Sequence, residues 1–244
     1  SEALRRRDPD ARLAMSAMIG EEIARMAGEI GERGAMVVGL GNRMVTPDAL
    51  GPLTVDKILV TRQIFQELTQ YADERLRSVC AMAPGVMGVT GIETAEMLES
   101  IVRRIRPGCV VCVDALSARS ARRIGAAVQI CDTGIQPGSG VGNRRLALNR
   151  ETLGVEVIAV GMPTVIYAAT LARDSFAAAA GREETEAALE QMERELMGAG
   201  PGDMIVTPRE IDGLIQDSAG MIAMGINRAL QPEMSDSEIL AMMD

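Results

Sequence analysis

The sequence predicts an α/β protein built on a mostly parallel, twisted sheet with helices on both faces. Short apolar runs such as AMVVGL, CVVCVDA and VEVIAVGM alternate along the chain with segments of helical spacing. The runs are almost wholly apolar, as expected of strands that are covered on both faces. A chain of 244 residues can form a sizeable core, so we expect residues 1–244 to form a single α/β domain.

Strands are predicted where a short apolar run is bounded by glycine, proline or polar residues. These runs occupy residues 35–40, 78–83, 109–115, 126–132, 144–149 and 155–162. Helices are predicted where apolar residues recur every three or four positions. They are expected at residues 10–33, 54–77, 93–105 and 163–180, with a short helical segment at 116–124 and an acidic helix or tail at 235–244.

Three further signals concern the second half of the chain. Pro163 is expected in the first turn of a helix, where proline is favourable. Thr207 followed by Pro208 and Glu210 has the pattern of a helix cap with a capping box. Residues 181–201 are charged and lead into Gly-Pro-Gly, which predicts an exposed helix or a mobile insertion.

The composition excludes several classes of chemistry. The chain has no histidine and a net charge of -9. The missing histidine excludes a Ser-His-Asp triad, a Cys-His pair and a zinc site that uses histidine. A hydrolase would then need carboxylates, a Lys or Cys nucleophile, or a metal held by oxygen and sulfur. The negative charge argues against nucleic acid as the main partner, and no apolar run approaches the ~20 residues of a membrane span. We expect a cytoplasmic protein.

The pair Cys109 and Cys112 has a spacing that can indicate metal or redox chemistry. Both residues fall in the predicted strand GCVVCVDAL. Residues three positions apart on a strand point to opposite faces. We therefore interpret both as small, buried, reduced side chains rather than as a metal or redox pair.

Two aspartates follow predicted strands at the same rim of the sheet. Asp48 lies in the loop VGLGNRMVTPDALGP after residues 35–40. Asp114 directly follows the apolar run that ends at Val113, at the carboxyl end of its strand. Ligands bind such sheets outside the carboxyl ends of the strands. Taken singly, each aspartate is more often a helix cap. Two together in a histidine-free protein indicate a carboxylate pair, in which one holds a proton while the other activates water.

Further candidates to line this site come from the neighbouring loops. Thr90 and Glu93 lie in PGVMGVTGIET, where they could equally serve a helix cap and its dipole. Asp132 ends another predicted strand and is a third acid on the rim. The set is completed by Asn42, Thr46, Arg119 and Arg144, of which the two arginines could orient carboxylates or bind acidic substrate residues.

The glycine-rich segment PGSGVGN, residues 137–143, looks like a phosphate loop but lacks the context of one. No lysine follows it as in a Walker sequence, and no long helix opens after it as in a dinucleotide fingerprint. We interpret its glycines as permitting a close backbone approach to a substrate or to a neighbouring loop. No cofactor is predicted.

Four motifs closely resemble the germination protease family of spore-forming bacteria. They are GLGNRMVTPDALGP, PGVMGVTGIET, DALSARS and GIQPGSGVGNRR, and the resemblance runs in order from about residue 35 to 230. It implies a fold similar to the hydrogenase maturation endopeptidases and an atypical aspartic peptidase. The two family aspartates fall on Asp48 and Asp114.

The resemblance also implies a biological setting. The family cleaves small acid-soluble spore proteins at germination, is made as a self-processing zymogen and assembles as a homotetramer, which here implies the spore core as location. Family members carry a longer N-terminal region than residues 1–34, so the resemblance implies that this chain is a fragment, a processed core or a short relative. Ser117 stands where the family usually has alanine.

Two other functions remain open from the sequence. One is a metal-dependent hydrolase in which Asp48 and Asp114, with Asp132 or Glu93, hold a divalent ion through oxygen ligands. The other is an inactive relative that serves in binding or assembly.

Overall fold

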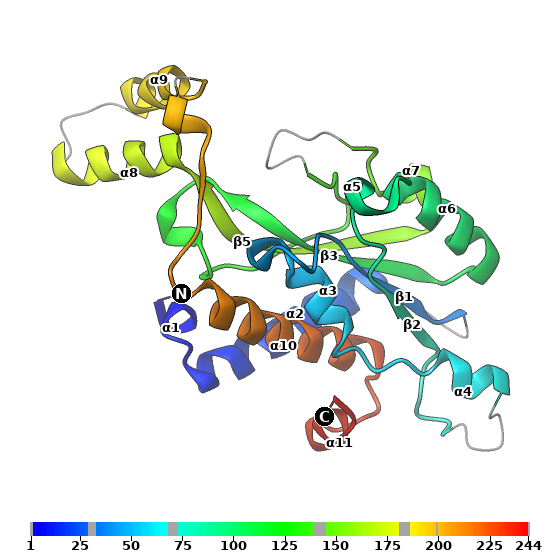
Figure 1. The fold of residues 1–244 in the computed structure, drawn as a ribbon. Helices are drawn as coiled ribbons and strands as arrows, with labels where there is room; N and C mark the ends of the chain where they lie inside the picture. The colour runs from blue at the N-terminus through cyan, green and yellow to red at the C-terminus, as the bar shows by residue number, and fades with distance from the viewer. Residues whose placement is uncertain are drawn as a thin grey trace.

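The computed structural model of the chain describes residues 2–28, 33–67, 73–138, 145–180, 186–198 and 200–243. Its centre is a sheet with the strand order β2-β1-β3-β5-β4, to which β6 adds by pairing with β5 (Figure 1). The strands are β1 (Ala35–Gly39), β2 (Val79–Met82), β3 (Cys109–Ala118), β4 (Gln129–Cys131), β5 (Glu156–Tyr167) and β6 (Ile205–Val206). The first three pairings are parallel, and the short strands β4 and β6 run antiparallel to β5.

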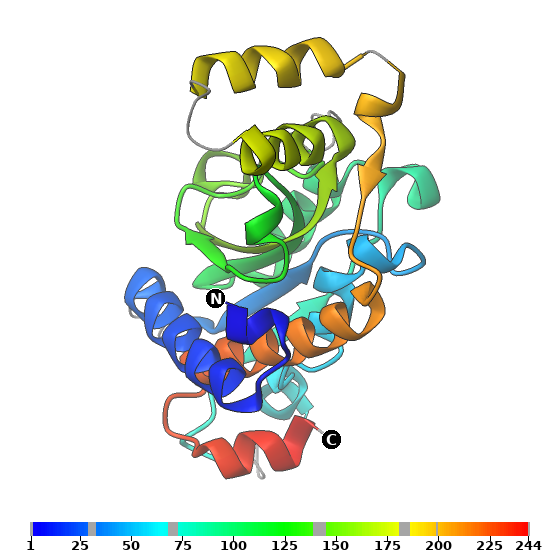
Figure 2. The ribbon, with the colours of Figure 1, turned by 90° about the vertical axis from the view of Figure 1, so that its left-hand side faces the viewer.

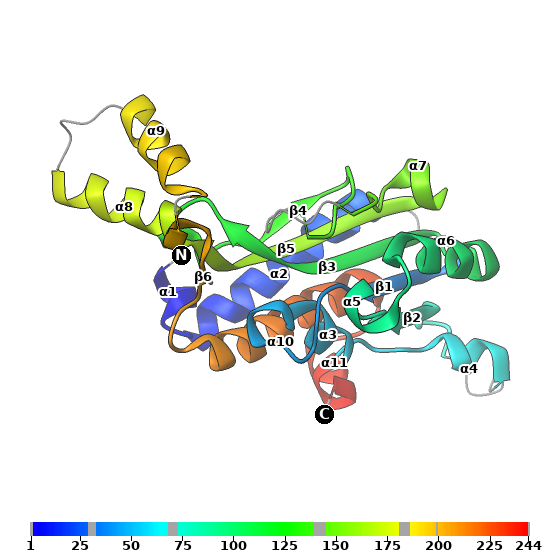
Figure 3. The same cartoon turned by 45° about the horizontal axis from the view of Figure 1, so that its top comes forward.

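Helices cover both faces of the sheet, which confirms the predicted fold class (Figure 3). On one face lie α2 (Pro9–Ala27), α3 (Leu50–Val55) and α10 (Ile211–Leu230); on the other lie α6 (Thr94–Ile105) and α7 (Arg150–Leu153). Alternate residues of β1 belong to the two cores, with Val37 in the first and Val38 in the second. This alternation is what a strand buried on both sides requires.

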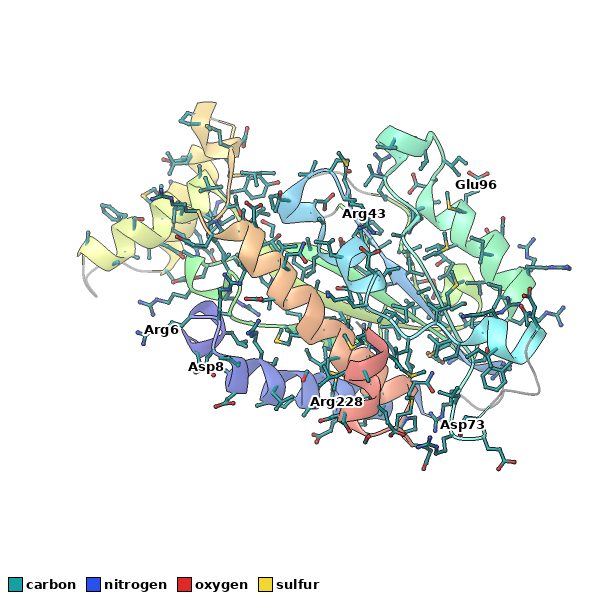
Figure 4. All side chains as sticks on the ribbon, turned by 60° about the horizontal axis from the view of Figure 1, so that its bottom comes forward. Arg6, Asp8, Arg43, Asp73, Glu96 and Arg228 are labelled. Atoms are coloured by element: carbon teal, nitrogen blue, oxygen red, sulfur yellow. The ribbon has the colours of Figure 1, made fainter. Side chains whose placement is uncertain are left out.

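The first core is closed by the helix pair α2 and α10. Asp8 caps α2 by accepting the Ala11 N–H at 2.9 Å, and the helix ends before Gly28, whose φ is +57°. Arg228, near the end of α10, lies between α2 and α11 (Asp236–Met243) (Figure 4). Its guanidinium donates to Ser16 Oγ at 2.7 Å and to Asp236 at 2.8 and 2.6 Å. The predicted C-terminal helix is therefore present and anchored.

An arm projects from one end of the sheet and is formed by α8 (Ala168–Ala180) and α9 (Glu186–Leu196) (Figure 2). After α9 the chain passes through a 3-10 turn (Gly200–Asp203) and returns as β6 beside the end of β5. The charged helix predicted within 181–201 is confirmed over the residues of α9, while 181–185 and 199 lie outside the described residues.

The single long helix predicted at 54–77 is wrong. The chain forms α3, which ends at Val55, and a separate α4 (Arg62–Glu67), while residues 73–78 are irregular. The break is fixed by a distant side chain, because Asn227 accepts the Leu59 N–H at 3.0 Å and donates to the Lys57 carbonyl at 2.9 Å. Those two bonds satisfy backbone groups that a helix would otherwise pair.

Pro163 lies inside β5 and does not begin a helix. Leu116 pairs with Pro163 and Ser117 with Val165, so the register shifts by one residue and Thr164 is left out as a bulge. A bulge is one of the few strand positions that tolerates a residue without an N–H. Beyond the bulge, Ser117 and Ala118 still pair with Val165 and Ile166. Strand β3 therefore continues to Ala118, and the helical segment expected at 116–124 is reduced to a 3-10 turn (Ala121–Arg123).

Three smaller features of the structure also differ from the predicted elements. Helix α10 begins at Ile211, and the Thr207 hydroxyl donates to the Thr164 carbonyl at 2.9 Å instead of capping the helix. Of the strand expected at 144–149, the described part makes a single bridge between Leu148 and Ile135. The short helices α1 (Glu2–Arg5) and α5 (Met87–Thr90) were not predicted. In the part of the chain that the structure describes, no helix is long and apolar enough to cross a bilayer.

Candidate active site

Asp48 lies at the end of a tight loop that leaves the sheet after β1. The loop closes through backbone hydrogen bonds from Val45 N–H to the Asn42 carbonyl at 3.0 Å and from Asp48 N–H to the Val45 carbonyl at 2.8 Å. Asp48 is the last residue of a 3-10 turn (Thr46–Asp48) that leads into α3. The loop therefore returns to the sheet end from which it departed.

Glycines allow this loop to approach the strand ends closely. Gly41 has φ +107°, and a Cβ there would lie 2.1 Å from the Asp48 carbonyl oxygen. A Cβ on Gly51 would lie 2.3 Å from the Leu40 carbonyl oxygen and 2.5 Å from that of Val113. These neighbours are backbone atoms, so a side chain would have to move the loop or the strands. Only glycine permits α3 to start directly on the carboxyl ends of β1 and β3.

Two further contacts hold the loop. Arg43 lies beside α3 (Figure 4) and pairs with Asp56 through two hydrogen bonds of 2.5 and 2.8 Å, while also donating to the Pro52 carbonyl at 3.1 Å. From the other side, the hydroxyl of the bulged Thr164 donates to the Pro47 carbonyl at 2.8 Å. The residue that precedes Asp48 is thus tied to β5.

Asp114 is the first residue of β3 beyond the end of β1. Gly39 of β1 pairs with Val113, and Asp114 pairs with Gly161 on β5. Its side chain is buried, with 7% of the residue exposed, and its Oδ1 accepts the N–H of Ala115 at 2.9 Å. The carboxyl group thus lies where the neighbouring strand stops, although β3 itself continues.

Burial and proximity shift the acidity of both carboxyl groups. Burial, with a second contribution from the charge of Asp48, raises the pKa of Asp114 to about 7. Burial also raises the pKa of Asp48, opposed by the Asn42 N–H that donates to its Oδ2 at 2.6 Å. Near neutral pH the pair therefore tends to hold one proton, with Asp114 as the protonated member. A pair in this state can supply both a proton donor and a proton acceptor.

The pair lies between two hollows of one cleft. Asp48, Asp114 and Gly138 line both of them. The first hollow, of about 360 Å³, is also lined by the Asp48 loop, by residues 85–88 and by Glu93 and Arg145. The second hollow, of about 610 Å³, extends along residues 115–119 of β3 to Gln129 and Gln136. A chain laid across the cleft would pass both carboxyl groups.

The structure brings together some of the predicted lining residues. Asn42 and Glu93 line the first hollow, and Arg119 lines the second. Thr46 begins the 3-10 turn and lines neither hollow. The Thr90 hydroxyl accepts the Ile92 N–H at 3.2 Å on the surface, as a turn residue rather than a site residue.

The placement of Asp132 on this rim is wrong. Strand β4 is antiparallel to β5, with Gln129 beside Gly161 and Cys131 beside Ala159. Its carboxyl end therefore points to the opposite rim, where Asp132 is exposed. Gln129, at the start of β4, occupies the site rim instead. Arg144 lies outside the described residues.

Two arginines of the cleft were missed by sequence reasoning. Arg145 lies 3.7 Å from Glu93 as an ion pair, and its Nη1 lies 2.9 Å from the sulfur of Met87. Arg123 lines the second hollow with Arg119. The run of arginines at 119–123 and the pair at 144–145 were the available signals, but neither indicates which member faces the cleft.

The interpretation of the Cys-x-x-Cys pair is confirmed. Cys109 and Cys112 are unpaired, fully buried on β3 and belong to opposite cores. Burial raises the pKa of each thiol to about 12, so both are neutral. Over the described ranges, no group of three Cys, Asp or Glu side chains is arranged to hold a metal ion.

The fold and the cleft define an α/β protein with a carboxylate pair as its candidate active site. A sequence model of the family described as germination protease matches residues 1–201. The germination protease of Clostridium perfringens strain 13 is 47% identical over 221 residues, covering 83% of this chain and 67% of that protein. The germination protease of Halalkalibacterium halodurans is 38% identical over 289 residues, covering 98% and 78%. The chain therefore belongs to the germination protease family and is a peptidase of that family.

Among solved structures, a [NiFe] hydrogenase maturation protease, HycI from Thermococcus kodakarensis, matches with a TM-score of 0.36 and 20% identity. The match covers 69% of this chain and 92% of that one.

Proposed function

We propose that this chain is an aspartic-type endopeptidase in which Asp48 and Asp114 activate water. The observation that supports this is the pairing of two carboxyl groups in one cleft, with burial raising the pKa of Asp114 to about 7. Each carboxyl group also has a backbone N–H donor that fixes its orientation, from Asn42 and Ala115 respectively. Preorganised donors and acids of this kind lower the barrier without rearrangement.

The reaction follows from the protonation of the pair. Ionised Asp48 accepts a proton from water while the water oxygen bonds to the carbonyl carbon of the scissile peptide. Protonated Asp114 donates its proton to the carbonyl oxygen, which gives a neutral tetrahedral diol. The C–N bond then breaks as Asp48 delivers its proton to the departing nitrogen. Asp114 takes back a proton from the diol hydroxyl, and the pair returns to its starting state.

The substrate proposed for the cleft is a small acid-soluble spore protein, cleaved when germination starts. The two hollows on either side of the pair suit an extended chain whose scissile bond lies over the carboxyl groups. The motifs shared with the family support the substrate and the setting, namely a homotetramer, made as a zymogen, in the spore core. We propose no nucleic acid or membrane as a direct partner, and residues 1–244 as one domain.

The test uses Asp48→Asn and Asp114→Asn with a small acid-soluble spore protein as substrate. Each change removes an acid or base of the pair and should lower turnover by about 10²–10⁴-fold while the fold is kept. Asp132→Asn is the matched control, because that aspartate is exposed on the opposite rim, and it should cleave at the wild-type rate. Near-full turnover in either cleft variant would exclude the pair as the catalyst.

The same assay separates the other two functions. A metal-dependent hydrolase would need a third ligand, and Asp132 lies away from the pair while Glu93 faces Arg145. Activity that EDTA removes and zinc or manganese restores would nevertheless recast both aspartates as ligands. A wild-type protein that cleaves no spore protein would support the inactive relative.

A further inference from the structure

Two side chains of α8 hold the segment that follows β3. Arg173 Nη2 donates to the Arg119 carbonyl at 2.7 Å. The Oδ2 atom of Asp174 accepts the Ser120 hydroxyl at 2.8 Å and the Ala121 N–H at 2.7 Å. The segment thus shares three hydrogen bonds with one helix, accepting one and donating two, and Figure 2 shows it beside α8. We call this set of contacts the α8 clamp.

The clamp is itself locked by α9. Arg173 Nη1 donates to Glu193 at 2.6 Å, and the Thr170 hydroxyl donates to the other oxygen of that carboxylate at 2.5 Å. Arg173 also pairs with Asp174 at 2.8 Å, and the three charged side chains are only 16–23% exposed. Burial alone would raise the pKa of Asp174, but hydrogen bonds from Arg173, Ala121 and Ser120 hold it below its ordinary value. The carboxylate therefore stays ionised at working pH.

The held segment forms a wall of the second hollow. Arg119 and Arg123 both line that hollow beside the aspartate pair. Just after the segment, the Gly125 N–H donates to the carbonyl of Pro163, next to the bulge of β5, at 2.9 Å. With the clamp at one end and the bulge at the other, the position of the wall is set by α8 and β5. An exposed loop without these contacts would have no fixed place.

We propose that Arg173 and Asp174 are positioning residues that hold residues 119–123 as a substrate-binding wall, so that the α8–α9 arm is part of the peptidase site. The inference rests on the proposed function, because it assigns the second hollow to the substrate chain. Neither side chain lines either hollow, so their effect is exerted through the segment. The arm would then control how tightly substrate binds, while the aspartate pair controls the chemical step.

The functional test compares Arg173→Ala with Arg194→Ala, using cleavage of a small acid-soluble spore protein. Arg194 is a matched control because it is also a helical arginine of the arm, paired to Glu190 at 3.7 Å, and its side chain is 68% exposed. Arg173→Ala should raise KM about tenfold or more through the loss of charge-assisted bonds, with kcat within about threefold of wild type. Arg194→Ala should leave both unchanged. Asp174→Asn, which keeps an acceptor oxygen, should lie between wild type and Asp174→Ala.

A second readout follows the clamp without using activity. Hydrogen exchange at the Ala121 amide should accelerate in Asp174→Ala, because its acceptor is lost, while amides in the centre of β3 stay protected. Unchanged exchange at Ala121, or a KM for Arg173→Ala within twofold of the Arg194→Ala value, would overturn the proposal. The proposal would also be overturned if Arg173→Ala lowered kcat as strongly as it raised KM, with both changes following a lower Tm. That result would show a merely structural role. A wild-type protein without activity would instead defeat the proposed function.

Discussion

Asp114→Asn should make the protein more stable at alkaline pH, even though it removes a proposed catalytic group. Burial raises the pKa of Asp114 to about 7 from an ordinary value of 3.8. The native state therefore binds this proton more tightly than the unfolded chain does. Its contribution to stability is full below pH 3.8 and is lost as pH rises from there to about 7.

The size of the effect follows from the two pKa values. A gap of about three pH units corresponds to about 4 kcal/mol at 1.36 kcal/mol per unit. Asparagine has nearly the same shape, keeps an oxygen for the Ala115 N–H and cannot ionise. We expect the variant to exceed the wild type by about 2–4 kcal/mol at pH 8, on the order of 10 °C in Tm, and to match it near pH 4.

The assay is urea unfolding of both proteins at a series of pH values between about 4 and 8. The difference between variant and wild type isolates Asp114, because other titrating groups are common to both. Asp132→Asn serves as the control, since that residue is exposed, and it should show no comparable rise. A variant that is equal to or less stable than the wild type at pH 8 would refute the assigned burial of a carboxyl group.

The other predictions concern glycine and cysteine residues in the packed parts of the fold. Gly51→Ala should destabilise the protein by about 3 kcal/mol and lower activity, because its Cβ would lie 2.3 Å from the Leu40 carbonyl oxygen. Gly220→Ala, in the middle of α10 with its nearest neighbour at 4.0 Å, should instead stabilise by about 0.5–1 kcal/mol; urea unfolding that gives both the same sign would contradict the packing. Replacing Cys109 and Cys112 together by alanine should cost on the order of 1 kcal/mol each and leave kcat intact, since both thiols are buried and neutral. Loss of turnover in that folded double variant would show a role that the structure does not account for.

The sheet and the aspartate pair could be predicted because their signals are local. An apolar run of strand length fixes a buried strand, and an acid or a glycine-rich loop at its carboxyl end falls on the ligand-binding rim. The position of Asp48 and Asp114 at one end of the sheet follows from these signals, while their catalytic role stays a prediction. The structure then explains why the loop after β1 needs glycines, since a Cβ on Gly51 would overlap backbone atoms of Leu40 and Val113.

The errors arose where a distant partner or a strand direction decides the structure. The break after α3 depends on Asn227, which is far along the chain from the Lys57 carbonyl that it binds. Pro163 stays in a strand because a bulge relieves its missing N–H. Asp132 was assigned to the wrong rim because an apolar run does not reveal whether its strand is parallel or antiparallel. None of these features has a signature within a short window of sequence.

The most direct test of catalysis by the aspartate pair is the pH dependence of kcat/KM for the wild type, measured with and without EDTA. Asp48 must be ionised, so the rate should fall on the acid side as pH drops through its pKa, which burial raises above 3.8. Asp114 must carry a proton, so the rate should fall on the alkaline side as pH rises through about 7. We predict a bell-shaped profile with an upper limb near pH 7 that EDTA does not change. A rate that keeps rising beyond about pH 8, or that vanishes in EDTA and returns with zinc or manganese, would contradict the shared-proton pair.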